Sequence, residues 1–477
     1  MKIGQGTPAG TCPLVVDLDG TLIHSDLLWE AIVLFIKTQF LRLWILPLWL
    51  FKGKAGFKDK LAGSVTLNAA SLPYDRTLIE LISAERALGR VIVLATGSDR
   101  RFAEAVANHL KLFDRVLATD GALNLTSHNK AGELVRLYGE QGFDYVGNDH
   151  VDIPVWQRAR QAFSVTRKPF ALGQGRQTTQ MGSLRGGWGR AFIKALRPRQ
   201  WLKNLLVFVP MLAGHALSVP VFLQSLLAFV AFSLCASSAY LLNDALDAGD
   251  DRVHPTKRRR PIAAGTLPLS VAIVASPLLA LAALALCAVF SPWLLLAVGL
   301  YFITTVCYSL YLKRLLMIDI CTLAILYSMR ILGGSASTQI EPSFWLLAFS
   351  FFIFLSLALL KRYSELFNLH RQGKEKTSGR GYTTADKIPV AIMGINSAFM
   401  SVLIFMLYFN SQNVLILYQH PGYLLGIVPL LVYWLGRLWL LAFHGQVNED
   451  PVLYVSKDRV SIIIVLLCGA LAFAAST

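Results

Sequence analysis

The stretch Asn243-Asp244-Ala-Leu-Asp247-Ala-Gly-Asp250-Asp251-Arg252 closes a long apolar run that begins near Val221. Carboxylates at the end of a membrane helix are costly unless a cation meets them. Asp244, Asp247 and Asp251 are spaced i, i+3 and i+7, so we expect them on one face of a helix. Oxygen ligands without His or Cys favour Mg²⁺, bound together with substrate phosphates.

A basic run follows directly, from His254-Pro-Thr-Lys257 to Arg260. Lys and Arg side chains at this place are suited to bind phosphate. The alternative is a membrane anchor whose basic residues stay inside and whose end is capped by acids. Because such an anchor does not need helically spaced aspartates, the pattern favours a metal and phosphate site.

The spacing Asn-Asp-x-x-Asp-x-x-x-Asp, on Asn243, Asp244, Asp247 and Asp251, resembles the first signature of the UbiA superfamily of intramembrane transferases. The resemblance implies that these aspartates hold Mg²⁺ on the diphosphate of a donor. It also implies that the membrane part folds as an all-α bundle.

Composition places the chain in a membrane. The 477 residues are 55% hydrophobic and 16% charged, too apolar for a soluble protein, and allow two or three domains. The net charge of +16 predicts basic cytoplasmic loops, with no nucleic-acid partner. Six scattered cysteines are expected to be buried thiols, neither disulfides nor metal ligands. Residues 1–10 lack a secretory signal, so the first domain is expected to stay cytoplasmic.

The first 170 residues place polar side chains at the ends of apolar strands. Leu14-Val15-Val16 predicts a buried strand that ends in Asp17-Leu-Asp19-Gly-Thr, where α/β sheets place their chemistry. Asp17 is suited to attack phosphorus, and Asp19 to protonate the leaving group. A second strand ends at Thr96, and Lys130 is suited to neutralise phosphate. A further strand ends in residues suited to Mg²⁺, namely Asn148, Asp149 and Asp152.

This order of elements resembles the haloacid-dehalogenase (HAD) phosphatase family over roughly residues 12–170. The resemblance implies an α/β Rossmann-like fold in which Asp17 forms an aspartyl-phosphate, Asp19 is the acid/base, and Thr96 and Lys130 position the phosphoryl group. The family's Gly-Asp-x-x-x-Asp has Asn148 in place of its first acid. An active phosphatase and a degenerate scaffold therefore stay open. The implied Mg²⁺ ligands are Asp17, Asp19, Asn148, Asp149 and Asp152.

An apolar stretch at 27–51 is interrupted by charges and Pro47, and we expect it to belong to a helical cap at about 25–75. A membrane span here would separate the two halves of the domain. Whether the cap leans on the bilayer or packs on the core stays open. The Gly- and Gln-rich segment 173–190 predicts a flexible linker, so the expected domains are 1–172 and 191–477.

The second domain contains nine apolar runs long enough to cross a bilayer. They lie near 202–219, 221–242, 271–290, 292–312, 316–335, 343–361, 389–409, 421–442 and 459–476. Lys and Arg occur in the connections after the second, fourth, sixth and eighth runs and are absent from the others. This asymmetry predicts a multi-pass inner-membrane protein with the N-terminal domain and the motif loops in the cytoplasm, and the C-terminus outside.

The second half carries Asp319 in a region where prenyltransferases of the superfamily usually have a second Asp-x-x-x-Asp. Here Leu323 stands four residues after Asp319, so a second Mg²⁺ site of that kind is doubtful. The alternative for Asp319 is a structural partner of Lys313 or Arg330 alone.

Further motifs accompany the single Asp319: Arg197-Pro-Arg-Gln-Trp-Leu-Lys203-Asn204, His254-Pro-Thr-Lys257, Arg260-Pro-Ile-Ala-Ala-Gly265 and Leu360-Lys361-Arg362-Tyr363-Ser-Glu365-Leu. Together, over about 195–475, they resemble the decaprenyl-phosphate phosphoribosyltransferase branch of the superfamily. The resemblance implies phosphoribosyl diphosphate as donor and polyprenyl phosphate as acceptor. Arg371–Arg380 would be a flap over the donor or an ordinary basic loop. The expected substrate-binding residues are Lys203, Asn243, Lys257, Arg260, Tyr308, Lys313, Asp319, Arg330, Lys361 and Arg362.

These expectations describe a Mg²⁺-dependent transferase whose product carries a ribose 5-phosphate that the HAD-like domain removes. One alternative is a prenyltransferase with a prenyl diphosphate donor and an aromatic or other acceptor. A second alternative is a membrane scaffold or transporter with a degenerate phosphatase. Acids gathered at one membrane face, and not along a path at midplane, argue against transport.

Overall fold

The computed structural model describes residues 12–51, 53–120, 124–185, 187–375, 381–409, 414, 417–447 and 450–476. The N-terminal eleven residues and residues 376–380 of the expected flap are outside this range. The chain forms two compact units. One comprises the residues up to Leu196 together with Tyr240–Ala275, and the other comprises Arg197–Ala239 and the residues from Ser276 onward.

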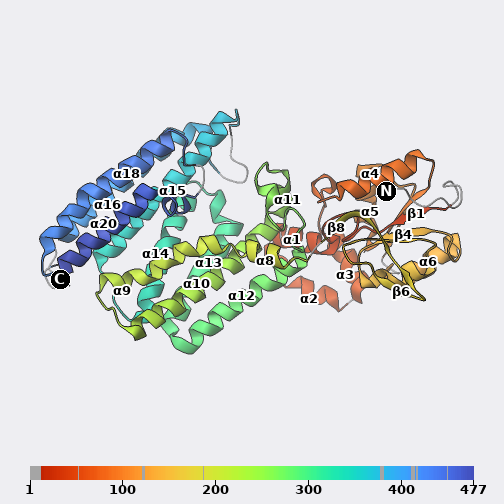
Figure 1. Cartoon of the computed structure of the whole chain (residues 1–477), viewed down its shortest axis with the longest axis horizontal. Coiled ribbons are helices and arrows are strands. Elements are labelled where there is room, and N and C mark those ends of the chain that lie inside the picture. Colours follow the sequence, from red (N-terminus) through yellow and green to blue (C-terminus); the bar gives the residue numbers. More distant parts are fainter. Residues whose placement is uncertain are drawn as a thin grey trace. The chain divides into compact units, whose positions relative to one another are not determined.

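A parallel sheet forms the centre of the first unit (Figure 1). Its order is β3-β2-β1-β4-β5-β8, and every neighbouring pair is parallel. The chain leaves β1 toward one edge and later returns to β4 on its other side, so the order reverses between these two strands. In such sheets a binding crevice lies at the carboxyl ends of the strands where the order reverses. The strands are β1 (Leu14–Val16), β2 (Ile92–Asp99), β3 (Arg115–Thr119), β4 (Asp144–Gly147), β5 (Ala162–Thr166) and β8 (Thr179–Arg185).

Both faces of the sheet are covered, which explains why its central strands are apolar throughout. Leu14 and Val16 pack on one face, with α4 (Arg76–Ala87) and α5 (Arg100–Leu110). Val15 points to the other face, where α6 (Ser127–Tyr138) and α7 (Ile153–Arg158) pack. The alternation along β1 thus supplies side chains to two separate cores.

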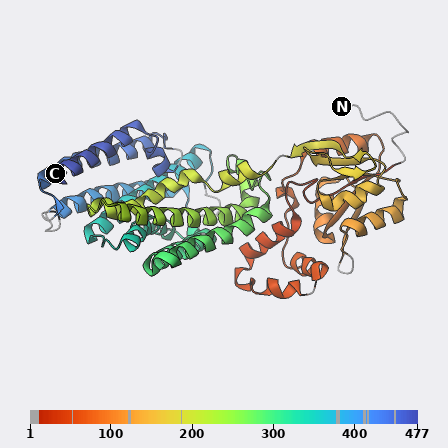
Figure 2. The same ribbon diagram turned by 60° about the horizontal axis from the view of Figure 1, so that its bottom comes forward.

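The expected cap is present as a helical lobe between β1 and α4 (Figure 2). Its helices are α1 (Leu27–Thr38), α2 (Ile45–Leu50) and α3 (Gly53–Ala62). Phe35 of α1 is buried in the core, whereas α2 buries no residue and leaves Trp44 67% exposed. The cap therefore packs on the core through α1 and presents an apolar surface at α2.

The segment 173–190 is not a linker throughout. Residues Thr179–Arg185 form β8, which extends the sheet beside β5, and a hairpin of β6 (Ala171–Gly173) and β7 (Arg176–Gln177) precedes it. The Gly and Gln content suggested a flexible chain, but backbone pairing with β5 satisfies the polar groups of this segment. A short helix, α8 (Gly189–Ala195), follows.

Eight helices of the described residues are long and apolar enough to cross a membrane, not the nine that we predicted. They are Val219–Leu246 (α10), Leu269–Phe290 (α12), Pro292–Leu310 (α13), Ile318–Thr338 (α14), Phe344–Arg371 (α15), Thr384–Phe409 (η7 and α16), Pro421–Phe443 (η8 and α18) and Arg459–Ser476 (α20). The predicted run at 202–219 instead falls on a 3₁₀ helix, η4 (Pro198–Phe208), and on α9 (Val209–Ala213). Pro210, inside the predicted run, lacks the N–H that a continuous α-helix would need at that position.

Within the second unit, helices that follow one another in sequence pack together. Helix α15 lies against α14 and α16, and α18 lies against α16 and α20 (Figure 1). Helix α15 extends ten residues past the predicted run and so carries Lys361 and Arg362 inside a continuous helix. All six cysteines are free; Cys235 and Cys287 are buried, but Cys307 is exposed on α13, contrary to our expectation.

Candidate functional site

Asp17 directly follows β1 and lies among hydrogen-bond donors from distant parts of the chain. Lys130 Nζ, on α6, donates to Asp17 Oδ1 at 2.7 Å. Thr21 Oγ1 donates to Asp17 Oδ2 at 3.0 Å. Both Asp17 and Lys130 are buried. A buried carboxylate that a lysine orients beside a pocket is suited to act as a nucleophile.

Asp19 lies two residues further on and has a different set of partners. Thr96 Oγ1 and Ser98 Oγ donate to Asp19 Oδ2 at 3.0 and 2.6 Å. The amide of Leu27, the first residue of α1, donates to Asp19 Oδ1 at 2.8 Å. Thr96, expected to contact a phosphoryl group, is thus placed on Asp19. Ser98, which we did not single out, lines the pocket.

Asp152 holds the loop after β4. Its Oδ1 accepts from Tyr145 Oη at 2.8 Å, and its Oδ2 accepts from the amides of Asn148 and Asp149 at 3.0 and 3.3 Å. Lys130 Nζ is 3.7 Å from Asp152 Oδ1. Asp152 is therefore engaged in positioning Asn148 and Lys130.

Burial changes the acidity of both candidate catalytic carboxyls. Burial and the charges of Asp152 and Asp19 raise the pKa of Asp17 to about 7, although Lys130 acts in the opposite direction. Burial and the charge of Asp26 raise the pKa of Asp19 to about 6, against the hydrogen bonds from Ser98 and Thr96. Burial thus favours the neutral form of both acids in the absence of a bound cation.

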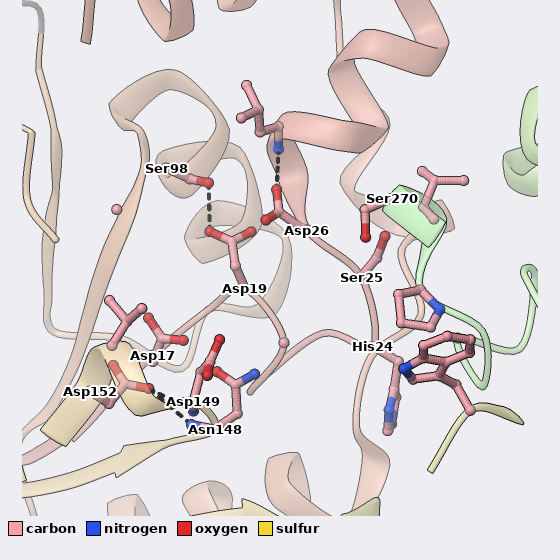
Figure 3. Close-up of a pocket in the computed structure, with 18 of the residues that line it drawn as sticks. Asp17, Asp19, His24, Ser25, Asp26, Ser98, Asn148, Asp149, Asp152 and Ser270 are labelled. Atoms are coloured by element: carbon pink, nitrogen blue, oxygen red, sulfur yellow. Dashed lines mark hydrogen bonds between the residues drawn. The ribbon is translucent and has the colours of Figure 1, made fainter. Parts of the chain in front are cut away.

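Figure 3 shows Asp17, Asp19, Asn148 and Ser98 around one side of a pocket, with His24, Ser25 and Ser270 on another side. The cavity has a volume of about 880 Å³. Lys58 of the cap also lines it and donates to the carbonyl of Gly97 at 2.6 Å. The volume is ample for a sugar phosphate.

A second acidic group lies at the end of α10, in the same unit. Arg260 Nη1 is 3.1 Å from Asp244 Oδ1 and 2.6 Å from Asp251 Oδ2. Both acids are buried. Burial raises the pKa of Asp251, although Arg260 and Lys257 act against this rise. Two carboxylates thus meet around one cationic group.

The helix that carries these acids is interrupted. Helix α10 ends at Leu246 and α11 (Ala248–Val253) begins after Asp247, so one continuous helical face is not formed. The i+4 hydrogen bonds Asp247 N to Asn243 O and Asp251 N to Asp247 O are nevertheless kept, at 2.9 and 2.8 Å. Asp244 and Asp251 therefore still converge, as their seven-residue spacing predicts.

In the second unit, Asp450 lies between two of the predicted substrate-binding lysines. It forms ion pairs with Lys203 and, at 3.4 Å, with Lys361. Burial alone would raise the pKa of Asp450. The charges of Lys361 and Lys203 nevertheless hold this pKa well below its usual range. We did not single out Asp450, because its position in a short loop before α19 (Pro451–Val455) carries no local signal.

Asp319 is buried at the start of α14. It accepts from Tyr382 Oη at 2.7 Å and forms an ion pair with Arg362, which also pairs with Glu365. Asp319 is thus paired with Tyr382 and Arg362, whereas we had considered Lys313 or Arg330. Tyr382 and Glu365 were missed as site residues.

Arg330 lies in a separate buried group. It donates to Asn204 Oδ1 and Tyr301 Oη, both at 2.8 Å, and lies over the rings of Tyr301 and Tyr327. Of the other predicted residues, Lys257 is exposed, and Asn243, Tyr308 and Lys313 are partly buried.

The arrangement of possible ligand atoms determines where a metal ion would fit. Among the described residues, no three His, Cys, Asp or Glu side chains lie together as a metal site. At the first pocket, Thr21 Oγ1 lies 3.0 Å from Asp17 Oδ2 and 3.1 Å from Asn148 Oδ1, so these two oxygens lie near each other. Asp17 and Asn148 fit an oxygen-only Mg²⁺ site, whereas Asp152 is engaged in the hydrogen bonds above. Asp244 and Asp251 fit a second cation position, which Arg260 fills here.

Comparison with known proteins gives the family. Residues 206–456 match the UbiA prenyltransferase family. The uncharacterized protein y4nM of Sinorhizobium fredii is 32% identical over 94% of this chain and 88% of its own length. Decaprenyl-phosphate phosphoribosyltransferase of Mycolicibacterium smegmatis is 39% identical over 40% of this chain and 63% of its own length.

The N-terminal region overlaps a solved HAD family hydrolase from Salmonella enterica serovar Typhi. The two are 16% identical, with a TM-score of 0.26, over 32% of this chain and 62% of that one. The family is shown by the match over residues 206–456 and by the y4nM relative, which covers 94% of this chain. The chain belongs to the UbiA prenyltransferase family.

Proposed function

We propose that the protein transfers 5-phosphoribosyl from phosphoribosyl diphosphate to a polyprenyl phosphate, and that its N-terminal domain then removes the 5-phosphate. The observation that carries the transfer step is the environment of Asp319. Leu323 stands where a second acid would follow, and Asp319 is occupied by Arg362 and Tyr382. This arrangement disfavours a second metal, because the Asp319 carboxylate is already paired with a guanidinium and a hydroxyl. The similarity to a phosphoribosyltransferase supports the same donor.

In the transfer step, an oxygen of the acceptor phosphate forms a bond to the anomeric carbon of the donor. The bond from that carbon to the diphosphate breaks, and diphosphate leaves. Arg260 and Lys257 are placed to neutralise its charge, and Asp244 and Asp251 orient Arg260. When bound, Mg²⁺ would neutralise phosphate charge at Asp244 and Asp251 and, in the first pocket, at Asp17 and Asn148.

In the phosphatase step, Asp17 attacks the phosphorus of the 5-phosphate. The bond from phosphorus to the sugar oxygen breaks, and that oxygen takes a proton from Asp19. Water then attacks the aspartyl-phosphate, returns a proton to Asp19 and releases inorganic phosphate. Lys130 orients Asp17, and the raised pKa of Asp19 favours its protonated form.

We further propose that the protein lies in the inner membrane with its N-terminal domain and motif loops in the cytoplasm. Basic residues in alternate loops support this orientation. Both proposed substrates, a cytoplasmic sugar diphosphate and a membrane lipid phosphate, are available at that face.

The transfer step is tested with purified protein in lipid nanodiscs, Mg²⁺ and polyprenyl phosphate. One reaction receives labelled phosphoribosyl diphosphate, and another receives labelled prenyl diphosphate with an aromatic acceptor. We expect label in the lipid fraction from the ribosyl donor alone. Transfer from the prenyl donor alone would replace this proposal with the prenyltransferase alternative, which the family's name favours.

The matched variants for this test are Asp251→Asn and Asp250→Asn. Asp251 is buried against Arg260, whereas the neighbouring Asp250 has a side chain that is 71% exposed. We expect transfer to fall about 100-fold in Asp251→Asn, because a group that neutralises transition-state charge is lost. Asp250→Asn should retain the wild-type rate.

A further inference from the structure

A buried ion pair joins the cap of the phosphatase-like domain to the segment that follows the aspartate motif. Arg252 Nη2 is 2.6 Å from Glu30 Oε1, and Arg252 Nη1 is 3.2 Å from Glu30 Oε2. Their side chains are only 8% and 9% exposed. Ser25 also donates to Glu30, and Arg252 reaches the carbonyl of Ala263 at 3.3 Å. A bidentate ion pair of this kind fixes the relative orientation of the two side chains.

A second contact lies close by. Gly265 has a φ of +68°, and a Cβ at this position would be 2.6 Å from the carbonyl oxygen of His24. Only a glycine lets the two backbones approach this closely. The segment 248–265 therefore contacts the cap region at three places: Asp250 pairs with Lys37 at 2.7 Å, Arg252 pairs with Glu30, and Gly265 lies against His24.

Each partner of the Glu30–Arg252 ion pair is connected to one of the two acidic sites: Arg252 to the site at Asp251, and Glu30 to the site at Asp19. Arg252 directly follows Asp251 in the sequence. Glu30 lies one turn after Leu27 on α1, and the amide of Leu27 donates to Asp19 at 2.8 Å. A shift of α1 would therefore move the Asp19 hydrogen bond and the Arg252 ion pair together.

The pocket at Asp17 is lined by the continuation of the same segment. Ala264, Gly265, Thr266, Pro268, Leu269 and Ser270 line it. Leu269 and Ser270 are the first residues of α12, which is long and apolar enough to cross a membrane. A substrate in the pocket thus lies beside the start of a membrane helix, so that a lipid carrier attached to it can stay in the bilayer.

We propose that Glu30 and Arg252 are positioning residues that hold segment 248–270 as a wall of the phosphatase pocket, which thereby accepts a sugar phosphate still attached to its membrane lipid. The inference rests on the proposed function and adds the residues that select the lipid-linked substrate. Binding of a free sugar phosphate does not depend on this wall. A lipid-linked sugar phosphate does depend on it, because the wall places the sugar phosphate at Asp17.

The test uses the full-length protein in nanodiscs with polyprenyl phosphate and phosphoribosyl diphosphate labelled in its 5-phosphate. Label is followed into the lipid and into inorganic phosphate, and hydrolysis of p-nitrophenyl phosphate is measured alongside. For Glu30→Gln and Arg252→Gln we expect phosphate release from the lipid to fall about tenfold relative to transfer, with p-nitrophenyl phosphate hydrolysis unchanged. The charge-swapped protein, Glu30→Arg with Arg252→Glu, should regain release.

The control pair is Glu133→Gln and Arg136→Gln, which removes an ion pair on the surface of α6 and should change nothing. Equal release and transfer in the Glu30 and Arg252 variants would overturn the inference. A parallel loss of p-nitrophenyl phosphate hydrolysis would also overturn it, because the pair would then only support the fold. If the wild-type protein makes the labelled lipid but releases no phosphate from it, the proposed phosphatase step fails, and this inference fails with it.

Discussion

Lys130 Nζ lies 2.7 Å from Asp17 Oδ1, although 113 residues separate them in the chain. Lys130 is on α6 and Asp17 follows β1, and the parallel sheet brings both to the crevice where the strand order reverses. The lysine places a positive charge beside the buried carboxylate that we propose as the nucleophile.

Replacing Lys130 should affect stability as well as hydrolysis. In Lys130→Met, Asp17 and Asp152 lose a buried cation, and breaking such a pair costs about 3–5 kcal/mol. We expect a lower Tm and no release of phosphate from the lipid product, with transfer retained. Arg136→Gln on the same helix, whose side chain is 68% exposed, is the control. Normal hydrolysis by Lys130→Met would show that the lysine has no part in the reaction.

Asp17 should make the stability of the Mg²⁺-free protein depend on pH. Its folded-state pKa of about 7 lies above the ordinary value of 3.8, because burial favours the neutral acid. Its contribution to stability is full below about pH 4 and is lost as the pH rises through about 7. Thermal unfolding between about pH 5 and pH 8 should therefore show a falling Tm in the wild type and a flatter one in Asp17→Asn. Parallel curves would mean that Asp17 ionises normally.

Arg260 should compete with a metal for the same acids. In Arg260→Met, Asp244 and Asp251 keep their charges without their guanidinium, which costs about 1–3 kcal/mol. We expect a lower Tm that Mg²⁺ restores more strongly than it stabilises the wild type. The measurement is Tm with and without Mg²⁺, beside Arg259→Met as an exposed neighbour. An identical response to Mg²⁺ in both variants would argue against a metal at these acids.

Asp450 should matter for donor binding. In Asp450→Asn, Lys203 and Lys361 lose the carboxylate between them and repel each other, so we expect the KM for phosphoribosyl diphosphate to rise about 10- to 100-fold. Asp458→Asn removes a comparable ion pair, with Arg437, and should leave KM unchanged. The measurement is the KM for phosphoribosyl diphosphate from steady-state kinetics. Equal KM values for the two variants would exclude Asp450 from the donor site.

Local patterns in the sequence were enough to predict several features correctly. The apolar run Leu14–Val16 predicted a buried strand with Asp17 at its end. The spacing of Asp244, Asp247 and Asp251 predicted one helical face. The structure interrupts that helix at Asp247, but Asp244 and Asp251 still converge, on Arg260. Long apolar runs predicted the membrane helices, because both the hydrophobic periods and the length needed to cross a bilayer are properties of short segments.

By itself, the sequence determined the membrane class, the parallel sheet with its acids at a strand end, and the family of the second domain. Only the tertiary structure decided which charges meet: Glu30 with Arg252, Asp450 with Lys203, and Asp319 with Arg362 and Tyr382. It also decided that residues 198–213 form a 3₁₀ helix followed by a short α-helix, and that 179–185 pairs with β5. The physical reason is that ion pairs and strand partners depend on chain segments far apart in sequence, which no local period records.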